Sequence, residues 1–245
     1  MACIIIPARW KSSRFPGKPL TLIGGVPLIL RVWEACCGSR LARRVIVATD
    51  DMRIAETAFA AGAEIAVTKP SHPSGTDRVA EVASRLPSES IVINVQGDEP
   101  FTDPRLVDKL IATLRDNPRL SMATAASPIE TKEDFLDPNV VKVVLAGDGR
   151  ALYFSRAPIP CDRDGASITA TLRHHGIYGY RRKFLLEFVK WKPSPLEKLE
   201  KLEQLRALEH GASIAVLRTH SAPPGIDTPD QAVAANAFLT SGKSR

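Results

Sequence analysis

Long apolar runs are absent from this 245-residue chain, because no stretch approaches the roughly 20 residues that a membrane-spanning helix needs. The apolar segment at residues 2–6 is too short for the core of a signal peptide, and no basic segment precedes it. We therefore expect no membrane partner and a place in the cytoplasm.

Cysteine is scarce as well. Cys3, Cys36, Cys37 and Cys161 have no C-x-x-C spacing, and Cys36 and Cys37 are adjacent in a segment with helical periodicity. This distribution indicates neither a zinc site nor a disulfide framework. Buried, reduced thiols are the expected state.

The excess of one charge is small: 33 Lys and Arg against 27 Asp and Glu give a net charge of +6. No basic stripe with interleaved aromatic residues accompanies it, so we expect no nucleic-acid partner. A small anionic ligand fits this balance. The length and the 44% hydrophobic content suit one α/β domain over residues 1–245.

The first half of the chain alternates short β-branched runs with longer amphipathic segments, which predicts βα units on a mostly parallel sheet flanked by helices. Capping residues at Asp51 and Asp103 predict the starts of two of these helices, and helical spacing from Leu28 predicts another. The predicted strands cover residues 3–6, 45–49, 65–68, 91–95 and 122–126.

The second half of the chain has a different pattern of apolar segments and turns. Residues 140–145 and 151–155 flank a glycine-containing turn, which predicts a hairpin within a smaller antiparallel sub-lobe at about residues 128–192. Ser194 begins a helix with capping-box spacing, and Gly211 is placed to end that helix. A strand at residues 214–217 and a final helix after Asp230 complete the prediction.

Three cations lie in the single connection after the first strand. Arg9, Arg14 and Lys18 accompany Gly17 there, and such a loop suits a polyphosphate. The loop has neither the P-loop pattern nor G-x-G-x-x-G, which disfavours a classical nucleotide hydrolase or dinucleotide enzyme. A solvated basic turn is the alternative.

Two isolated carboxylates follow apolar runs. Asp98 ends the run at residues 91–95, and Asp227 precedes the final helix. Ligands bind at the carboxyl ends of strands in open α/β sheets, so these side chains could meet there and hold Mg²⁺. Two unrelated turn aspartates are the alternative.

Other polar groups could complete a site. Residues 74–78 could contact a base or ribose, or simply cap a helix, while Arg156 and residues 173–180 could bind an acidic second substrate. Neighbouring histidines on a strand point to opposite faces, so His174 and His175 are not a metal-binding pair. Residues 203–204 could lie on a solvated helix surface or bind a polyol.

The ordered set of these segments resembles the 3-deoxy-manno-octulosonate cytidylyltransferase family, also called CMP-Kdo synthetases, over nearly the whole chain. The resemblance is carried by residues 6–9, 14–20, 94–100, 153–156, 174–180, 194–197, 202–206 and 225–229. Single segments are weak signals, since the basic loop recurs loosely in other sugar nucleotidylyltransferases. Their order is specific.

The resemblance implies a nucleotide-diphospho-sugar transferase fold, which is Rossmann-like, and transfer of CMP from CTP to the sugar acid Kdo for lipopolysaccharide biosynthesis. It also implies Mg²⁺, bound by Asp98 and Asp227, and a homodimer. Lys18 and these two aspartates would be catalytic. The nucleotide would contact Pro7, Ala8, Arg9, Arg14, Lys18, Ser74, Arg78 and Gln96, and Kdo would contact Arg156, His174, Tyr178, Glu203 and Gln204.

His175 departs from the apolar residue expected at its position in this family. The metal and CTP residues could also serve a cytidylyltransferase for 8-amino-Kdo or sialic acid, although the form of the loop at residues 14–18 argues against sialic acid. A non-catalytic nucleotide-binding module is a further alternative. Both aspartates argue against it, because binding alone needs no metal at the α-phosphate.

Overall fold

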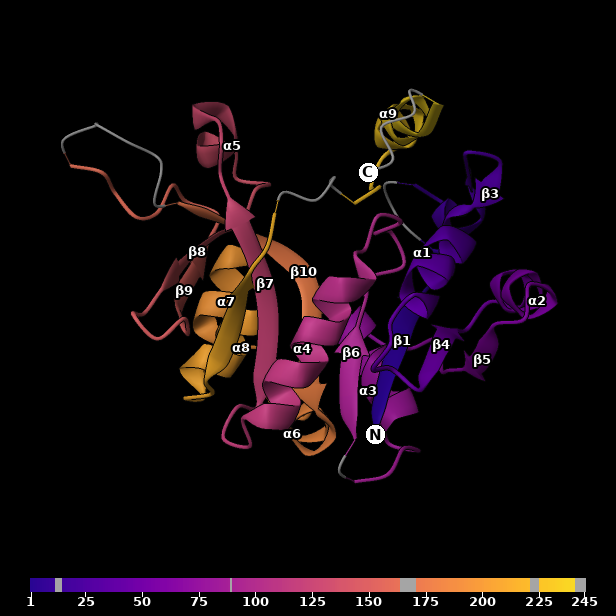
Figure 1. The fold of residues 1–245 in the computed structure, drawn as a ribbon, viewed down its shortest axis with the longest axis horizontal. Helices are drawn as coiled ribbons and strands as arrows, with labels where there is room; N and C mark the ends of the chain where they lie inside the picture. Colours follow the sequence, from indigo (N-terminus) through magenta and orange to yellow (C-terminus); the bar gives the residue numbers. More distant parts are fainter. Residues whose placement is uncertain (12–14, 89, 164–170, 221–224, 241–245) are drawn as a thin grey trace.

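The computed structural model describes the chain apart from residues 12–14, 89, 164–170, 221–224 and 241–245. Nine strands of the described residues form one sheet, and Figure 1 shows the hairpin of β8 (Lys142–Leu145) and β9 (Ala151–Ser155) at the opposite end of the molecule from β5. The other seven strands follow this spatial order: β11 (Ile214–Arg218), β7 (Met122–Pro128), β10 (Leu172–Arg181), β6 (Ile91–Asn94), β1 (Ala2–Ala8), β4 (Arg44–Thr49) and β5 (Glu64–Val67).

Most of the sheet is parallel, as predicted. The neighbouring pairs β1–β4, β1–β6, β4–β5 and β7–β11 are all parallel, whereas β10 runs antiparallel to both β6 and β7. The predicted hairpin is confirmed as β8 (Lys142–Leu145) and β9 (Ala151–Ser155). Because β8 also pairs with β10, the hairpin extends the main sheet. The boundaries of the sub-lobe stay a prediction.

Strand β1 explains how the core is organised. All of its residues are buried, as expected for a central strand covered by helices on both faces. Ile4 and Ile6 pack on one face, against α1 (Leu28–Cys37), α2 (Met52–Ala60), α4 (Pro104–Asp116) and α9 (Pro229–Thr240). Ile5 packs on the other, against α3 (Gly75–Ala83), α6 (Arg182–Phe188) and α8 (Gln204–Glu209).

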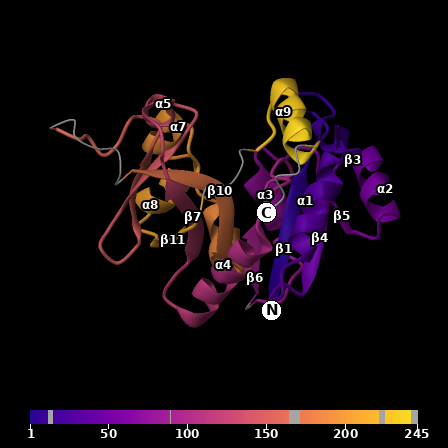
Figure 2. The same ribbon diagram turned by 45° about the horizontal axis from the view of Figure 1, so that its top comes forward.

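The last helix returns to the beginning of the chain. In Figures 1 and 2, α9 lies close to α1 and to the small hairpin of β2 (Leu22–Ile23) and β3 (Val26–Pro27). The side chain of Asn236 fixes this contact, because its Oδ1 accepts a hydrogen bond of 2.6 Å from the Gly24 amide. The loop before α9 is thereby held near the loop that follows β1.

The single helix predicted from Ser194 to Gly211 is wrong. The capping box of Ser194 and Glu197 is present, but α7 (Pro195–Glu200) ends at Lys201, whose φ of 54° is left-handed. A left-handed residue stops a helix, and here it lets the chain turn so that Leu202 is buried. The second helix, α8, then begins at Gln204 and ends before Gly211.

Several short elements were not predicted from the sequence. They are the 3-10 helix η1 (Lys18–Leu20), the β2–β3 hairpin, and the helices α5 (Lys132–Leu136) and α6. All four cysteines are free, and Cys37 and Cys161 are exposed, contrary to the expected burial of every thiol. Among the described residues, no helix has the length and apolar character required to cross a bilayer.

Candidate active site

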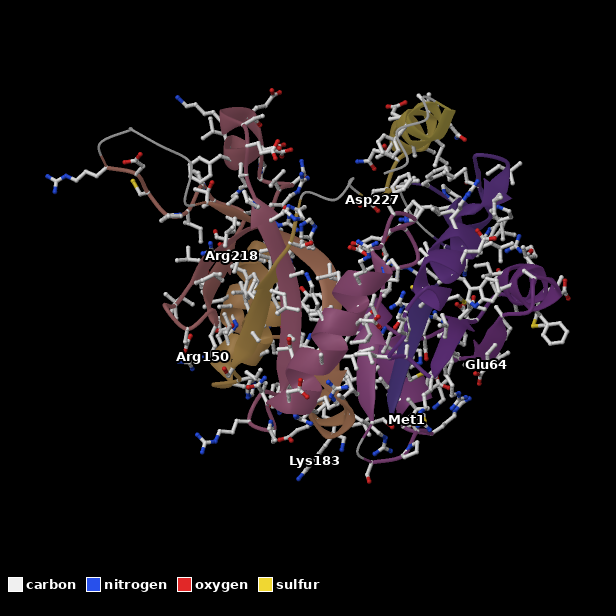
Figure 3. The ribbon with its side chains drawn as sticks, in the orientation of Figure 1. Met1, Glu64, Arg150, Lys183, Arg218 and Asp227 are labelled. Carbon is white, nitrogen blue, oxygen red and sulfur yellow. The ribbon has the colours of Figure 1, made fainter. Side chains whose placement is uncertain are left out.

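The candidate site lies at the carboxyl ends of β1 and β6. These strands are parallel neighbours, with Ile5 in register with Asn94, so the loops that follow them leave the same edge of the sheet. Figure 3 labels Asp227 at this edge, opposite Met1 at the start of β1. The β1 loop carries Lys18, the β6 loop carries Asp98, and Asp227 arrives from the loop before α9.

Backbone contacts bring the two predicted aspartates together. The Ile226 amide donates a hydrogen bond of 2.8 Å to the Asp98 carbonyl. The Asp227 amide donates one of 2.6 Å to Gln231 Oε1, which holds the loop against the first turn of α9. Gly97 is required next to Asp98, because a Cβ there would lie 2.8 Å from the Pro7 carbonyl oxygen.

Lys18 lies between the two carboxylates. Its Nζ donates hydrogen bonds of 2.6 Å to Asp98 Oδ2 and 2.9 Å to Asp227 Oδ1. Gly17, with a φ of 72°, makes the turn that delivers Lys18 at the start of η1, and its amide donates to the Trp10 carbonyl at 3.2 Å. The carboxylates of Asp98 and Asp227 therefore meet at one point, which the Lys18 ammonium occupies.

The site has more negative than positive charge. Burial raises the pKa of Asp98, and the Lys18 ammonium opposes that rise. Burial, followed by the charges of Asp98 and Asp227, raises the pKa of the neighbouring Glu99 to about 7. Two carboxylates thus contact one ammonium with a third carboxyl group beside them, an arrangement that favours a further cation.

The donors fit Mg²⁺ in part. Carboxylate oxygens from Asp98 and Asp227 are the hard ligands that this ion prefers. Outside the gaps in the described chain, no cluster of three or more His, Cys, Asp or Glu is arranged to hold a metal. The two aspartates would therefore hold Mg²⁺ only together with oxygens from a substrate or water, as is usual for this ion.

A cavity of about 920 Å³ opens beside this pair of aspartates. Its lining contains four of the residues predicted to contact the sugar acid, namely Arg156, His174, Tyr178 and Gln204, as well as Asp98 and Asp227. Both predicted metal ligands and four of the five predicted sugar-binding residues therefore line one cavity.

His174 and Tyr178 come from β10, whose pairing with β7 shifts register between residues 175 and 178. The His174 ring lies 5.4 Å from the Tyr178 ring, and its Nε2 is 3.0 Å from Thr124 Oγ1. Burial lowers the pKa of His174 to about 3, so the imidazole is neutral and suited to hydroxyl groups. Thr124 was not predicted, because it lies within an apolar strand.

Arg156 lines the cavity but has backbone partners. Its Nε donates to the Glu200 carbonyl at 2.7 Å, and its Nη1 donates to the Pro138 carbonyl at 2.9 Å. Its own amide donates to Glu200 Oε2 at 2.9 Å. The guanidinium is thus fixed in the wall, with part of its donor capacity already used.

A second cavity, of about 590 Å³, contains Ser74, Gln96 and Glu203 in its lining. The first two were predicted to contact the nucleotide and Glu203 to contact Kdo. The Glu203 carboxylate accepts hydrogen bonds of 3.2 Å from Ser74 Oγ and 2.5 Å from Thr76 Oγ1. The structure therefore groups Glu203 with the predicted nucleotide residues, while its neighbour Gln204 lines the larger cavity.

The remaining predicted nucleotide residues have varied positions. Pro7 and Ala8 are buried at the end of β1, and Arg9 follows them in an exposed position. Arg78 is only 4% exposed and its guanidinium bonds Thr68 Oγ1 and, at 2.8 Å, Asp50, so it supports α3 from within the core. Arg14 lies outside the described residues.

His175, the departure noted in the sequence, also lines the larger cavity. Its Nε2 lies 2.9 Å from Ser127 Oγ, and burial lowers the pKa of this imidazole to about 4. The hydroxyl partner explains how a polar ring is accommodated at this position.

Comparisons with known proteins show the family of this chain. The family described as cytidylyltransferase matches residues 3–214. A 3-deoxy-manno-octulosonate cytidylyltransferase of Syntrophotalea carbinolica is 47% identical, covering 96% of this chain and 97% of that relative. One of the same name from Chromohalobacter salexigens is 49% identical, covering 98% of this chain and 97% of that relative.

Solved structures give the same result. A CMP:2-keto-3-deoxy-manno-octonic acid synthetase complexed with CTP superposes with a TM-score of 0.93 at 41% identity, with 98% of each chain covered. A 4-diphosphocytidyl-2C-methyl-D-erythritol synthase of Anaerococcus prevotii, at 14% identity and a TM-score of 0.64, with 98% of each chain covered, shares the fold. The chain therefore belongs to the cytidylyltransferase family, among the relatives of the 3-deoxy-manno-octulosonate cytidylyltransferases.

Proposed function

We propose that this chain transfers CMP from CTP to the anomeric hydroxyl of Kdo, giving CMP-Kdo and pyrophosphate. The observation that carries the proposal is the convergence of Asp98 and Asp227 on Lys18 at the edge of a cavity lined by Arg156 and His174. The names of two similar relatives and the CTP complex of a similar structure support the same substrates.

In this reaction the Kdo hydroxyl oxygen forms a bond to the α-phosphorus, and the bond from that phosphorus to the oxygen shared with the β-phosphorus breaks. That oxygen leaves as part of pyrophosphate, and the hydroxyl proton passes to water. Such chemistry depends on placement and on neutralisation of charge. Bound between Asp98 and Asp227, Mg²⁺ would neutralise phosphate charge and make the attacking hydroxyl more acidic. Lys18, together with Arg9 and Arg14 of the same loop, would hold the triphosphate.

The two cavities divide the substrates in this proposal. Ser74 and Gln96 would contact the nucleotide, and the hydrogen bond of 3.0 Å from Gln96 Nε2 to Asn94 Oδ1 would orient the Gln96 amide. His174, Tyr178 and Gln204 would contact the sugar hydroxyls as neutral hydrogen-bonding groups. We assign Glu203 to the nucleotide side, because its partners are Ser74 and Thr76.

Arg78 would act indirectly, by fixing the start of α3 from below through Asp50 and Thr68. Arg156 would keep the sugar-binding wall in place and present its remaining N–H groups to the Kdo carboxylate. We further propose that the enzyme works as a cytoplasmic homodimer in lipopolysaccharide biosynthesis. Light scattering on the purified protein would test whether it is a dimer.

A pyrophosphate-release assay with Mg²⁺ tests the proposal directly. CTP, UTP and ATP are each combined with Kdo, 8-amino-Kdo and sialic acid, and we expect the highest kcat/KM for CTP with Kdo. Preference for 8-amino-Kdo or sialic acid would replace the sugar and keep the chemistry. Absence of pyrophosphate release from every pair would contradict enzymatic function and favour a nucleotide-binding module.

A further inference from the structure

Lys142 is a charged residue in the core. It begins β8, and its side chain is fully buried, with an exposure of 0%. Its Nζ donates hydrogen bonds of 2.9 Å to the Asp137 carbonyl, 2.6 Å to the Val140 carbonyl and 2.7 Å to the Arg156 carbonyl. An ammonium group has three N–H donors, so this set uses them all.

The three carbonyls belong to residues in the wall of the larger cavity. Asp137, Val140 and Arg156 all line it, and they come from two separate parts of the chain. Residues 137–140 connect α5 to β8 without regular structure, and Arg156 directly follows β9. The ammonium therefore ties an irregular connection to the end of a strand.

A second cation reinforces the same wall. The Arg156 guanidinium donates to the Pro138 carbonyl, so the irregular connection is held by both Lys142 and Arg156. Asp137 and Glu200 are the carboxylates near this place, and Glu200 accepts hydrogen bonds from Ser155 Oγ at 2.6 Å and from the Arg156 amide. Both cations bind mainly backbone carbonyls, so charge-assisted hydrogen bonds hold this wall together.

The ammonium form suits this environment. Burial lowers the pKa of Lys142, while the charges of Asp137 and Glu200 oppose that effect. A neutral amine would offer two donors to three buried carbonyls, and an unsatisfied buried carbonyl is unfavourable. The local hydrogen bonding therefore favours the charged side chain.

We propose that Lys142 is a positioning residue for the acidic sugar: it fixes the cavity wall at residues 137–140 and Arg156 without touching the substrate. This inference rests on the proposed function, since it assigns the larger cavity to Kdo. Loss of the ammonium releases the wall and leaves the nucleotide residues around Ser74 unaffected. The KM for Kdo changes, and the KM for CTP does not.

Arg181 offers a matched control. It too is a cation bound to three backbone carbonyls, donating to Leu120 at 2.8 Å, to Asn117 at 3.0 Å and to Leu114. Arg181 is the last residue of β10, whereas Lys142 pairs with Arg173 near the start of that strand. Neither cavity has Arg181 in its lining. R181M therefore removes a comparable set of hydrogen bonds from a place remote from the sugar.

The experiment compares wild type, K142M and R181M in pyrophosphate release, with CTP and Kdo varied separately, alongside thermal unfolding. We expect K142M to raise the KM for Kdo about tenfold or more, with the KM for CTP within about twofold of wild type. R181M lowers Tm and leaves both KM values unchanged. Equal changes in both KM values for K142M, no change in either, or the same pattern in R181M would overturn the proposal.

A second variant covers a failure of K142M to fold. K142A leaves space for n-propylammonium, and added amine is expected to lower the KM for Kdo, whereas n-propanol does not. If neither variant folds even with the amine, Lys142 serves the whole fold and the positioning role is rejected. Inactive wild-type enzyme would refute the proposed function itself, whereas active wild type with an unaltered K142M refutes this inference alone.

Discussion

Two regions of the site hold their charges in different ways: the first contains Lys18 with Asp98 and Asp227, and the second is the cavity wall that contains Arg156 and is held by Lys142. Lys18 pairs with two carboxylates that are 26% and 42% exposed, so its partners can be exchanged for phosphate or a metal ion when a ligand arrives. Lys142 and Arg156 bind backbone carbonyls, which do not move independently of the chain. His174 adds a neutral imidazole to that second region.

This difference follows from what each region has to do. A site for phosphoryl transfer has to accept new charge, and these partly exposed ion pairs can exchange their partners for a ligand. A wall that recognises a sugar gains from being fixed before binding, because ordering it during binding would reduce affinity. We therefore expect substitutions in the first region to alter turnover and those in the second to alter affinity.

The largest effect is expected at the two aspartates. D98N and D227N each remove one carboxylate from the point where they meet Lys18, and each should lower kcat by about 100-fold or more, because a proposed Mg²⁺ ligand and its charge are lost. Pyrophosphate release measures this, and circular dichroism checks that the fold is intact. D230N, an exposed aspartate three positions further on, is the control. Activity near wild type in D98N or D227N would contradict the metal assignment.

Lys18 tests whether charge in the first region is exchangeable. K18M should lower kcat/KM for CTP by about 10- to 100-fold, because an ammonium contact to the triphosphate is lost. It should also strengthen Mn²⁺ binding in the absence of nucleotide, since the ammonium no longer occupies the point between Asp98 and Asp227. Calorimetric titration with Mn²⁺ measures the second effect, with K11M in the same loop as control. Weaker Mn²⁺ binding in K18M would show that the lysine does not compete with the ion.

Parts of this arrangement were predictable from the sequence because simple geometry governs them. Asp98 follows a buried parallel strand, and parallel strands deliver their loops to one edge, so its place at that edge followed from the pattern. Its contact with Asp227 also needs the loop before α9, because β7 and β10 separate β11 from β6. Lys142 also left a signal, since a lysine inside the β-branched run at residues 140–144 is unexpected.

Other parts depend on contacts that no local pattern encodes. The separation of Glu203 from Gln204 follows from the left-handed Lys201, which breaks the predicted helix. The core position of Arg78 depends on its ion pair with Asp50, in the connection between β4 and α2. Tertiary partners of this kind override local propensity, and they decide which of two neighbouring polar residues faces a given substrate.

The neighbours Glu203 and Gln204 line different cavities, so the proposed boundary between the two substrates falls between them. E203Q should raise the KM for CTP about threefold to tenfold, because hydrogen bonds to Ser74 and Thr76 weaken. Q204A should instead raise the KM for Kdo by a similar factor. Each variant serves as the control for the other in steady-state assays with both substrates varied. An effect of E203Q confined to Kdo would return Glu203 to the sugar.

The smallest effect concerns the fixed wall and pH. An unfolded histidine binds a proton near pH 6.5, whereas burial lowers the pKa of His175 to about 4, so protonation favours the unfolded chain in between. His175 therefore stabilises the fold fully above pH 6.5, and this contribution is lost as the pH falls toward 4. In H175Q the free energy of unfolding should fall less steeply over this range, by about 1 kcal/mol per pH unit. Urea unfolding at pH 6.5, 5.5 and 4.5 measures the difference, with exposed His210 replaced as control. Parallel pH dependences for H175Q and wild type would contradict this prediction. They would mean that the pKa of His175 is the same in the folded and the unfolded chain, so that its burial contributes nothing to the pH dependence of stability.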